Sequence, residues 1–313
     1  MMFCRTFVGL AAMLLVAACA SGPSTGTPPT GESQDTAPAS TNGPTTYQAV
    51  GAVLESSAHG PELCSAVLES LPPQCGGVPI AGWDWAIVDG EQQANDTTWI
   101  DTVQITGAFD GTTFTLASAR VPTAEVADVG PPPDERHAPC TEPEGGWEAQ
   151  GAKFVPPTSG GSHALYGPVN EYVAAQPDGA GTWIDWMSGA DLTSGDNDPT
   201  KMIFVAQFTG DLARHEADLR QIWTGALCVA EAPLTSEALK ALAAEITTPI
   251  RDGRLTLDNG ITLRLISWGM EGNPATGTVD LDVIFAPPEA QAYFDAKYGP
   301  GRVVLRAQIQ PVP

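Results

Sequence analysis

The sequence is poor in basic residues. Its 313 residues include 14 Lys and Arg against 37 Asp and Glu, which gives a formal net charge of −23 at pH 7. Nucleic-acid binding needs a Lys and Arg surface, so this imbalance excludes a general nucleic-acid binder. The chain also lacks a Gly-x-y repeat, a sustained heptad and a second long apolar run, which excludes collagen-like, coiled-coil and polytopic membrane classes.

The sequence motifs of several enzyme classes are missing as well. Outside the low-complexity segment 20–46 there is no G-x-S-x-G elbow. There is also no H-E-x-x-H and no G-K-[ST] loop, and Gly179-Ala180-Gly181 stops short of G-x-G-x-x-G. The chain is therefore expected not to be an enzyme and to hold no metal or cofactor.

The four histidines are scattered along the chain, and none has a nucleophile at motif spacing. Residues 159–163, Ser-Gly-Gly-Ser-His, come nearest to a hydrolytic site, but their composition favours a loop. His215 stands among charged residues over 214–218, which predicts the solvated face of a helix.

A calcium site has some support from acidic residues near the middle of the chain. Asp191, Asp196, Asn197 and Asp198 could supply oxygen ligands. Pro199 stands where the calcium loop of an EF-hand needs Gly, and no Glu completes that loop, so an Asp- and Asn-rich turn is favoured.

The amino terminus has the layout of an export signal. A cationic start is followed by an apolar stretch over residues 7–18 that ends in small residues. The sequence Val16-Ala17-Ala18-Cys19 resembles the lipobox of bacterial lipoproteins. This resemblance implies that residues 1–18 are a signal peptide and that Cys19 becomes a lipid-bearing first residue, with acyl chains such as palmitate in the outer face of the cell membrane. Cleavage beside an incidental Cys and a single membrane-spanning helix are the alternatives, although the run is short for a span.

A low-complexity segment follows the cysteine. Apart from Glu32, Gln34, Asp35 and Asn42, every residue of 20–46 is Ser, Thr, Gly, Pro or Ala. Such a composition cannot bury enough apolar surface to offset chain entropy, so residues 19–46 are predicted to be a disordered, lipid-anchored tether.

The remaining cysteines agree with export. Cys64, Cys75, Cys140 and Cys228 are an even number, which predicts two disulfides with three connectivities. Proximity favours Cys64–Cys75, and elimination then leaves Cys140–Cys228. A zinc site is the rival interpretation, but the sequence has no C-x-x-C.

Alternating patterns predict an α+β chain with two folded parts. Short strands around an Asp110-Gly111 turn, with a helix over residues 61–71, favour a small OB-like β-barrel over residues 47–121. A Pro- and Gly-rich connection is expected over 122–162. Alternating helix and strand patterns over 163–313 predict an α+β sandwich with its helices packed on one sheet. They include strands over 202–208 and 226–231 and a helix that Thr235 or Ser236 caps.

Two families share features with the chain. Gly181-Thr182-Trp183-Ile184-Asp185, the apolar run 203–209, Val229 and Leu239 resemble the pro-domain of secreted α-lytic-type serine proteases over residues 180–245. That resemblance implies an α+β scaffold and no protease. The mature chain is also similar to a group of uncharacterised lipoproteins of high-GC Gram-positive bacteria, through residues 71–76, 82–85, 208–215, 225–229 and 298–301. This similarity implies export and two domains, but no activity.

Aromatic residues are the most informative candidates for a binding site. Trp83 and Trp85 stand two apart on a predicted strand and would face one side, and Trp183 and Trp186 frame Asp185. Paired rings beside a carboxylate can stack on a sugar, whereas large rings also fill small cores.

These features predict a lipid-anchored protein of the cell envelope with a non-enzymatic binding or accessory role. Its expected partners are the membrane, through the lipid on Cys19, and envelope proteins or wall glycan, but no nucleic acid. A module that binds wall glycan or calcium is one alternative, and an unrecognised hydrolase with His163 or His137 beside an acid is another.

Overall fold

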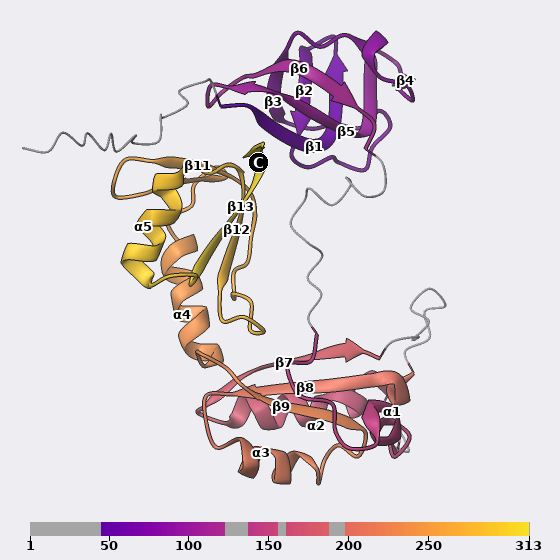
Figure 1. The fold of residues 1–313 in the computed structure, drawn as a ribbon, viewed down its shortest axis with the longest axis vertical. Coiled ribbons are helices and arrows are strands. Elements are labelled where there is room, and N and C mark those ends of the chain that lie inside the picture. Colours follow the sequence, from indigo (N-terminus) through magenta and orange to yellow (C-terminus); the bar gives the residue numbers. More distant parts are fainter. Residues whose placement is uncertain (1–44, 123–136, 156–160, 188–197, 313) are drawn as a thin grey trace, which may run out of the picture. The chain divides into compact units, whose positions relative to one another are not determined.

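The structure is a computed structural model that describes residues 45–122, 137–155, 161–187 and 198–312, with backbone only for 161–164. The chain is α+β, as predicted, and strands outnumber helices in it (Figure 1). Its strands form a large sheet of ten strands and a separate sheet of three strands.

Five strands at the start of the described chain pair in a ring. Each of the five pairs with two others in the order β1-β2-β3-β6-β5-β1, in which only β3 and β6 run parallel, and β4 adds to the outer edge of β5 (Figure 1). The strands are β1 (Tyr47–Ser56), β2 (His59–Cys64), β3 (Gly77–Ala81), β4 (Gln92–Ala94), β5 (Thr97–Phe109) and β6 (Phe114–Arg120). Alternate residues of these strands, including Val53, Leu63, Ile105 and Phe114, form a buried core.

The local turn prediction in this part is confirmed, but the helix prediction is wrong. Asp110 closes the β5–β6 hairpin, and its carboxylate accepts hydrogen bonds from the backbone N–H groups of Thr112 and Thr113. Residues 61–64, expected to begin a helix, belong instead to strand β2. Strand β2 pairs with β1 and β3, and these tertiary partners satisfy its backbone as a helix would otherwise have done.

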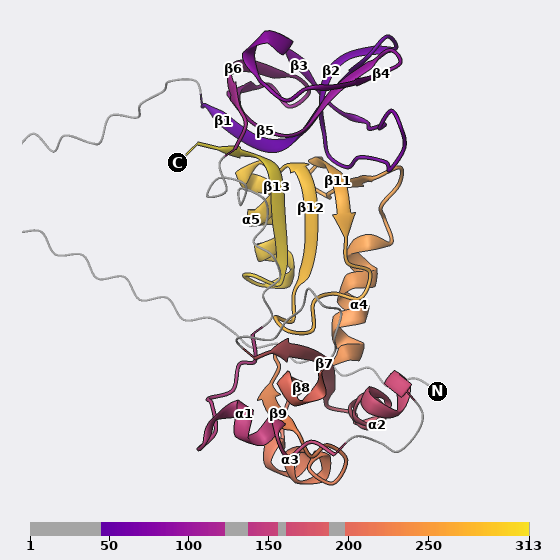
Figure 2. The ribbon, with the colours of Figure 1, turned by 90° about the vertical axis from the view of Figure 1, so that its right-hand side faces the viewer.

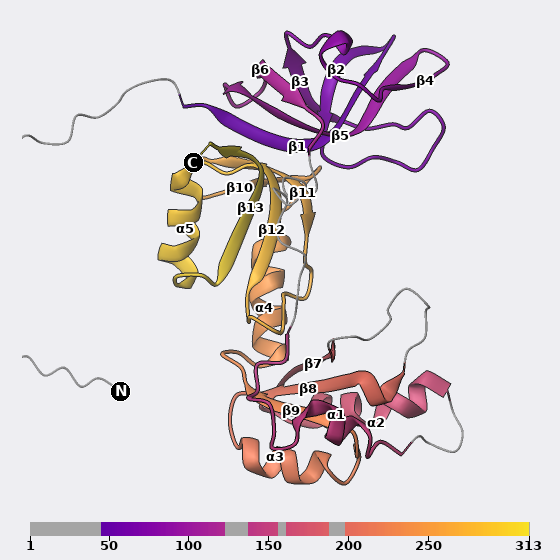
Figure 3. The same cartoon turned by 45° about the vertical axis from the view of Figure 1, so that its right-hand side comes forward.

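The three-stranded sheet lies in the middle of the chain. It has the order β7-β8-β9, from β7 (Gly179–Trp186), β8 (Met202–Phe208) and β9 (Ala226–Glu231). The helices α2 (Gly161–Ala175) and α3 (Leu212–Leu219) pack on one face of this sheet (Figure 3). Ala138, Cys140 and Trp147 cover the other face, so part of the predicted connection packs on this sheet and includes the short helix α1 (Gly146–Gly151).

The last part of the chain has two helices on one face of a sheet. Helices α4 (Ser236–Thr247) and α5 (Pro288–Tyr298) pack on the strands β10 (Arg254–Thr256), β11 (Thr262–Trp268), β12 (Val279–Phe285) and β13 (Val303–Pro311) (Figure 2). Thr235 caps α4 as expected, since its hydroxyl accepts from the Ala238 N–H at 3.1 Å. Val279, Leu281 and Val283 alternate toward these helices.

The prediction of a single sheet over residues 163–313 is wrong. Its strands are divided between the three-stranded sheet and the large sheet, where β13 pairs with both β12 and β1. The pairing of β13 with β1 joins Tyr47 to Pro311, almost the full described length apart, and no local pattern encodes such a contact.

Candidate functional site

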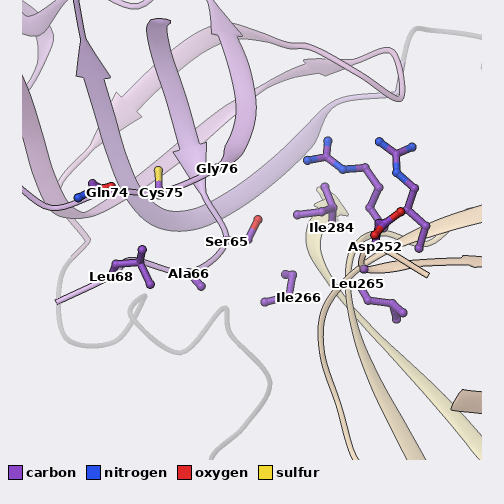
Figure 4. A pocket seen from close by; sticks show the side chains of 13 residues that line it. Ser65, Ala66, Leu68, Gln74, Cys75, Gly76, Asp252, Leu265, Ile266 and Ile284 are labelled. Carbon is purple, nitrogen blue, oxygen red and sulfur yellow. The ribbon is translucent and has the colours of Figure 1, made fainter. Parts of the chain in front are cut away.

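A cavity of about 510 Å³ lies between the segment that joins β2 to β3 and the strands β10 to β12 (Figure 4). Cavities of this size accommodate small organic molecules. The residues that line it are Ser65, Ala66, Leu68, Gln74, Cys75, Gly76, Asp252, Gly253, Arg254, Arg264, Leu265, Ile266 and Ile284.

One wall of this cavity is a cross-linked loop. Strand β2 ends at Cys64, which forms a disulfide with Cys75 with a Cα–Cα distance of 5.6 Å. Inside this loop the N–H of Leu68 donates to the carbonyl of Gln74 at 2.9 Å. The hydroxyl oxygen of Ser65 is buried and has no hydrogen-bond partner in the part of the chain that the structure describes. The wall is therefore held in shape by the cross-link and carries an unused donor.

The opposite wall carries two arginines. Leu255 and Leu263 are buried under α4 and α5, so their neighbours Arg254 and Arg264 lie on the other face of the β10–β11 hairpin. The register pairs Arg254 directly with Arg264. Neither arginine belongs to a motif, but each stands five residues from Asn259, and the Asn259-Gly260 turn signal could have revealed the hairpin that pairs them.

The charges of the cavity are unevenly balanced. The Arg264 guanidinium donates to the carbonyl of Gly77 at 3.3 Å, and among the described residues no carboxylate lies within ion-pair distance of Arg254 or Arg264. Asp252, at the turn before β10, is the one acidic residue among those that line the cavity. Two cations and one anion therefore face a cavity in a chain of net charge −23.

The predicted arrangement of Trp83 and Trp85 is wrong. Strand β3 ends at Ala81 and Trp85 begins a short 3-10 helix, so the two rings do not share a strand. The rings meet edge to face at 5.3 Å and pack against the core inside the ring of strands. The indole N–H of Trp85 donates to the carboxylate of Glu55 at 2.6 Å, while the indole N–H of Trp83 is buried without a partner among the described residues. Asp84, between the two tryptophans, caps the 3-10 helix by accepting a hydrogen bond from the Ala86 N–H.

Trp183 and Asp185 do not form one site, because their side chains have different contacts. Trp183 is 9% exposed and packs in the core between the three-stranded sheet and the segment around Cys140. The carboxylate of Asp185 accepts from the Ala138 N–H at 2.7 Å and lies 3.6 Å from the His137 ring. Trp183 therefore supports the core, and Asp185 fixes the start of the covering segment.

A second cavity does contain an aromatic and acidic set. It measures about 390 Å³, and its lining includes Asp185 with two tryptophans, Trp147 and Trp186. Glu142 and Glu148 line it as well. Trp186, rather than Trp183, is thus the ring that accompanies Asp185 at a cavity surface.

The disulfide predictions are confirmed. Cys64 pairs with Cys75 across a sequence separation of 11, and Cys140 pairs with Cys228 across 88. The second bond attaches the segment before α1 to strand β9.

His215 is buried, so the solvated helix face predicted for it is wrong. Its side chain is fully inaccessible and stacks on Phe208 with a ring distance of 3.6 Å. Its Nε2 lies 3.0 Å from the carboxylate of Asp178, and its Nδ1 lies 2.9 Å from the hydroxyl of Tyr172. The hydrogen bond to His215 lowers the pKa of Asp178, and burial raises the pKa of Tyr172. Only the tertiary contact with β8 and α2 distinguishes His215 from the exposed residues beside it.

Several predicted residues lie outside the described part of the chain. They include Cys19 and the tether up to residue 44, Ser159, and the calcium candidates Asp191, Asp196 and Asn197. Asp198 is described and caps a short 3-10 helix by accepting from the Thr200 N–H at 2.9 Å. The backbone places residues 161–163, expected in a loop, at the start of α2.

Comparisons with family models, with curated proteins and with solved structures find no match for this chain. No helix within the described ranges is long and apolar enough to cross a membrane. The same ranges hold no group of three or more His, Cys, Asp or Glu side chains arranged around a metal position.

Proposed function

We propose that the chain is an exported lipoprotein, anchored through Cys19 to the outer face of the cell membrane after removal of residues 1–18. The lipobox-like sequence supports this proposal, and so do the two disulfides, since such bonds persist in oxidising compartments. Residues 19–46 would hold the folded part away from the bilayer.

The anchor can be tested directly by mass spectrometry of the mature amino terminus. A diacylglyceryl-modified Cys19 is expected, together with release of the Cys19→Ala variant from the membrane fraction. Recovery of an unlipidated chain from the cytosol with free thiols would refute this assignment.

Two folded parts remain our proposal for the rest of the chain. Five strands paired in a ring favour an OB-like barrel over residues 47–121. An α+β part over 163–313 would follow, on whose three-stranded sheet the residues around Cys140 and Trp147 pack, and its strand β13 reaches back to β1.

The function that we favour is non-enzymatic binding of a small molecule at the cell envelope, and the 510 Å³ cavity carries this proposal. Its walls come from segments far apart in the sequence, and a disulfide fixes one of them. A preformed cavity that needs no loop ordering loses less free energy on binding.

Gly76 offers a clean way to close the cavity. It lines the cavity, and a Cβ added there would meet no atom within 4 Å, so Gly76→Trp should fill the space without strain. Gly60 also has open space at its Cβ but does not line the cavity, so Gly60→Trp is the matched control. Small molecules from an envelope extract should be retained by the wild type and by Gly60→Trp and be lost from Gly76→Trp. Equal retention by all three proteins, or no retention by any, would refute binding in this cavity.

Wall glycan is a second candidate ligand, supported by the cavity of Trp147, Trp186 and Asp185. Aromatic rings beside carboxylates can stack on a sugar and accept its hydroxyl hydrogen bonds. An N-acetylglucosamine oligomer should then bind the wild type and the Trp268→Ala control, whose ring is exposed outside that cavity, but not Trp186→Ala. Equal binding to the two variants would exclude this site.

The hydrolase alternative has one observation in its favour, the 3.6 Å approach of His137 to Asp185. The His137 side chain is 72% exposed, so it lies largely in solvent rather than in an enclosed site. Turnover of an envelope substrate by the purified chain would overturn the non-enzymatic proposal.

A further inference from the structure

The pairing of Arg254 with Arg264 is the least expected feature of the 510 Å³ cavity. Directly opposed residues on antiparallel strands have Cβ atoms about 4.5–5.5 Å apart, and like charges at such positions are destabilising. The fold nevertheless places both guanidinium groups on the face of the hairpin that lines the cavity. Only 14 of the 313 residues are basic, so two unpaired arginines at one cavity are notable in this chain.

Most of the hydrogen-bond donors of this pair are unused. Each guanidinium carries five N–H donors in a planar fork that matches a carboxylate or a phosphate. The Arg264 guanidinium makes one hydrogen bond, to the Gly77 carbonyl, and the Arg254 guanidinium makes none to the described residues. The buried Ser65 hydroxyl adds a further unused donor at the opposite wall.

The remainder of the lining is largely apolar. Figure 4 shows Ile266, Ile284 and Leu265 grouped beside Asp252 on the wall opposite Leu68. Ile284 is buried and Ile266 is half-buried against the core inside the ring of strands. A ligand that fills this space therefore meets donors at one end and hydrocarbon along its body.

We propose that this cavity binds a small organic anion, with its carboxylate or phosphate group held between Arg254 and Arg264 and its apolar body against Ile266 and Ile284. This inference rests on the proposed binding function and adds the chemical class of the ligand. The Asp252 carboxylate, which also lines the cavity, weakens the attraction.

The test uses calorimetric titration of the purified full chain in detergent at constant salt. Benzoate and phenyl phosphate are the probes, and benzamide is the neutral control of similar shape. Both anions should bind the wild type, at least about tenfold more tightly than benzamide, because hydrogen bonds to charged groups are the stronger class. Benzamide binding as tightly as benzoate would overturn the proposal.

Variants then assign the effect to the arginine pair. Arg254→Gln and Arg264→Gln should each weaken benzoate binding about tenfold or more, and Asp252→Asn should strengthen it. Arg251→Gln removes the same charge three residues away, where the guanidinium bonds only to backbone carbonyls of its own turn, and it should leave the affinity within about twofold. Equal effects of Arg254→Gln and Arg251→Gln would overturn the assignment.

Two controls separate this inference from its foundation. Arg264 contacts the Gly77 carbonyl, so its variant is accepted only with an unchanged thermal midpoint, whereas Arg254 has no such contact and keeps the test decisive. If neutral molecules bind the wild type and are lost from Gly76→Trp, the cavity is a ligand site but not an anion site. If Gly76→Trp retains every ligand that the wild type retains, the proposed function itself fails.

Discussion

The two disulfides are expected to have opposite rankings for stability and for ligand binding. Removing Cys140–Cys228 with a Cys140→Ala, Cys228→Ala double variant opens a loop of sequence separation 88. Removing Cys64–Cys75 in the same way opens a loop of separation only 11.

The chain-entropy relation converts these loop lengths into free energies. By restricting the unfolded chain, the disulfide contributes about 4.6 kcal/mol of stability for the long loop and about 2.8 kcal/mol for the short one. The variant without Cys140–Cys228 should therefore be about 1.8 kcal/mol less stable than the variant without Cys64–Cys75. Cavity binding should follow the reverse order, because Cys75 lines the 510 Å³ cavity and neither Cys140 nor Cys228 does.

The assay combines urea unfolding, followed by tryptophan fluorescence and circular dichroism, with benzoate titration of each folded variant. The Cys64–Cys75 variant should lose more affinity and less stability than the Cys140–Cys228 variant. If the short-loop variant were the less stable of the two, the entropic reasoning would be refuted. If both variants bound benzoate as the wild type does, the disulfide would not be what shapes the cavity wall.

Three further predictions concern the fold. Replacing His215 by Phe should keep a ring against Phe208 but remove the hydrogen bonds of His215 to Asp178 and Tyr172, although Tyr172 still donates to Asp218. This change should lower the free energy of unfolding by about 1–3 kcal/mol in a urea titration. An unchanged stability would show that the cluster is not a structural one. The pKa of Asp178 is lowered in the folded chain, so its carboxylate contributes to stability above the unfolded pKa of about 4, and this contribution is lost as the pH falls through the lower folded pKa. The stability of Asp178→Asn should therefore decline less between about pH 5 and pH 2 than that of the wild type. Parallel declines would contradict this. A Cβ at Gly107 would lie 2.0 Å from the carbonyl oxygen of residue 115, so Gly107→Ala should lower stability by about 3 kcal/mol. The control Gly60→Ala has open space at its Cβ and should change stability by no more than about 0.5 kcal/mol. Equal effects of the two substitutions would refute the steric argument.

The cluster around His215 also shows a general feature of this chain, that several charged positions acquire their role only from packing. Lys297 lies 3.0 Å from Asp258 and 5.4 Å from the centres of the Tyr293 and Tyr298 rings, and the hydrogen bonds to Tyr293 and Asp258 raise its pKa. These contacts attach α5 to the turn between β10 and β11. That turn joins the two strands that carry the arginines of the cavity, so the fold supports the site from its helical side.

The alternation of apolar residues predicted most strands correctly. Strand β8 over Met202–Phe208 and strand β9 over Ala226–Glu231 have the predicted bounds, and α4 begins after the predicted cap Thr235. Side-chain direction follows backbone conformation, so a period of two or of 3.6 residues is visible without knowledge of neighbours. The disulfide pairs were also accessible, since four cysteines allow few connectivities.

The candidate site was not accessible in this way. Trp83, Trp85, Trp183 and Trp186 were singled out by residue type. The fold uses the first three rings largely for packing and brings Trp186 to a cavity. Arg254 and Arg264 belong to no sequence motif. They line a cavity only because the loop that ends at Cys75 supplies its opposite wall.

The sequence alone thus predicted export, and it correctly predicted the disulfide pairs and most of the helices and strands, because each of these depends on residues that are close together or few in number. The tertiary structure alone decided that β13 pairs with β1, that His215 is buried, and that two arginines face a cavity. These outcomes depend on contacts between segments that lie far apart along the chain, where a residue's environment is set by its partners rather than by its own type.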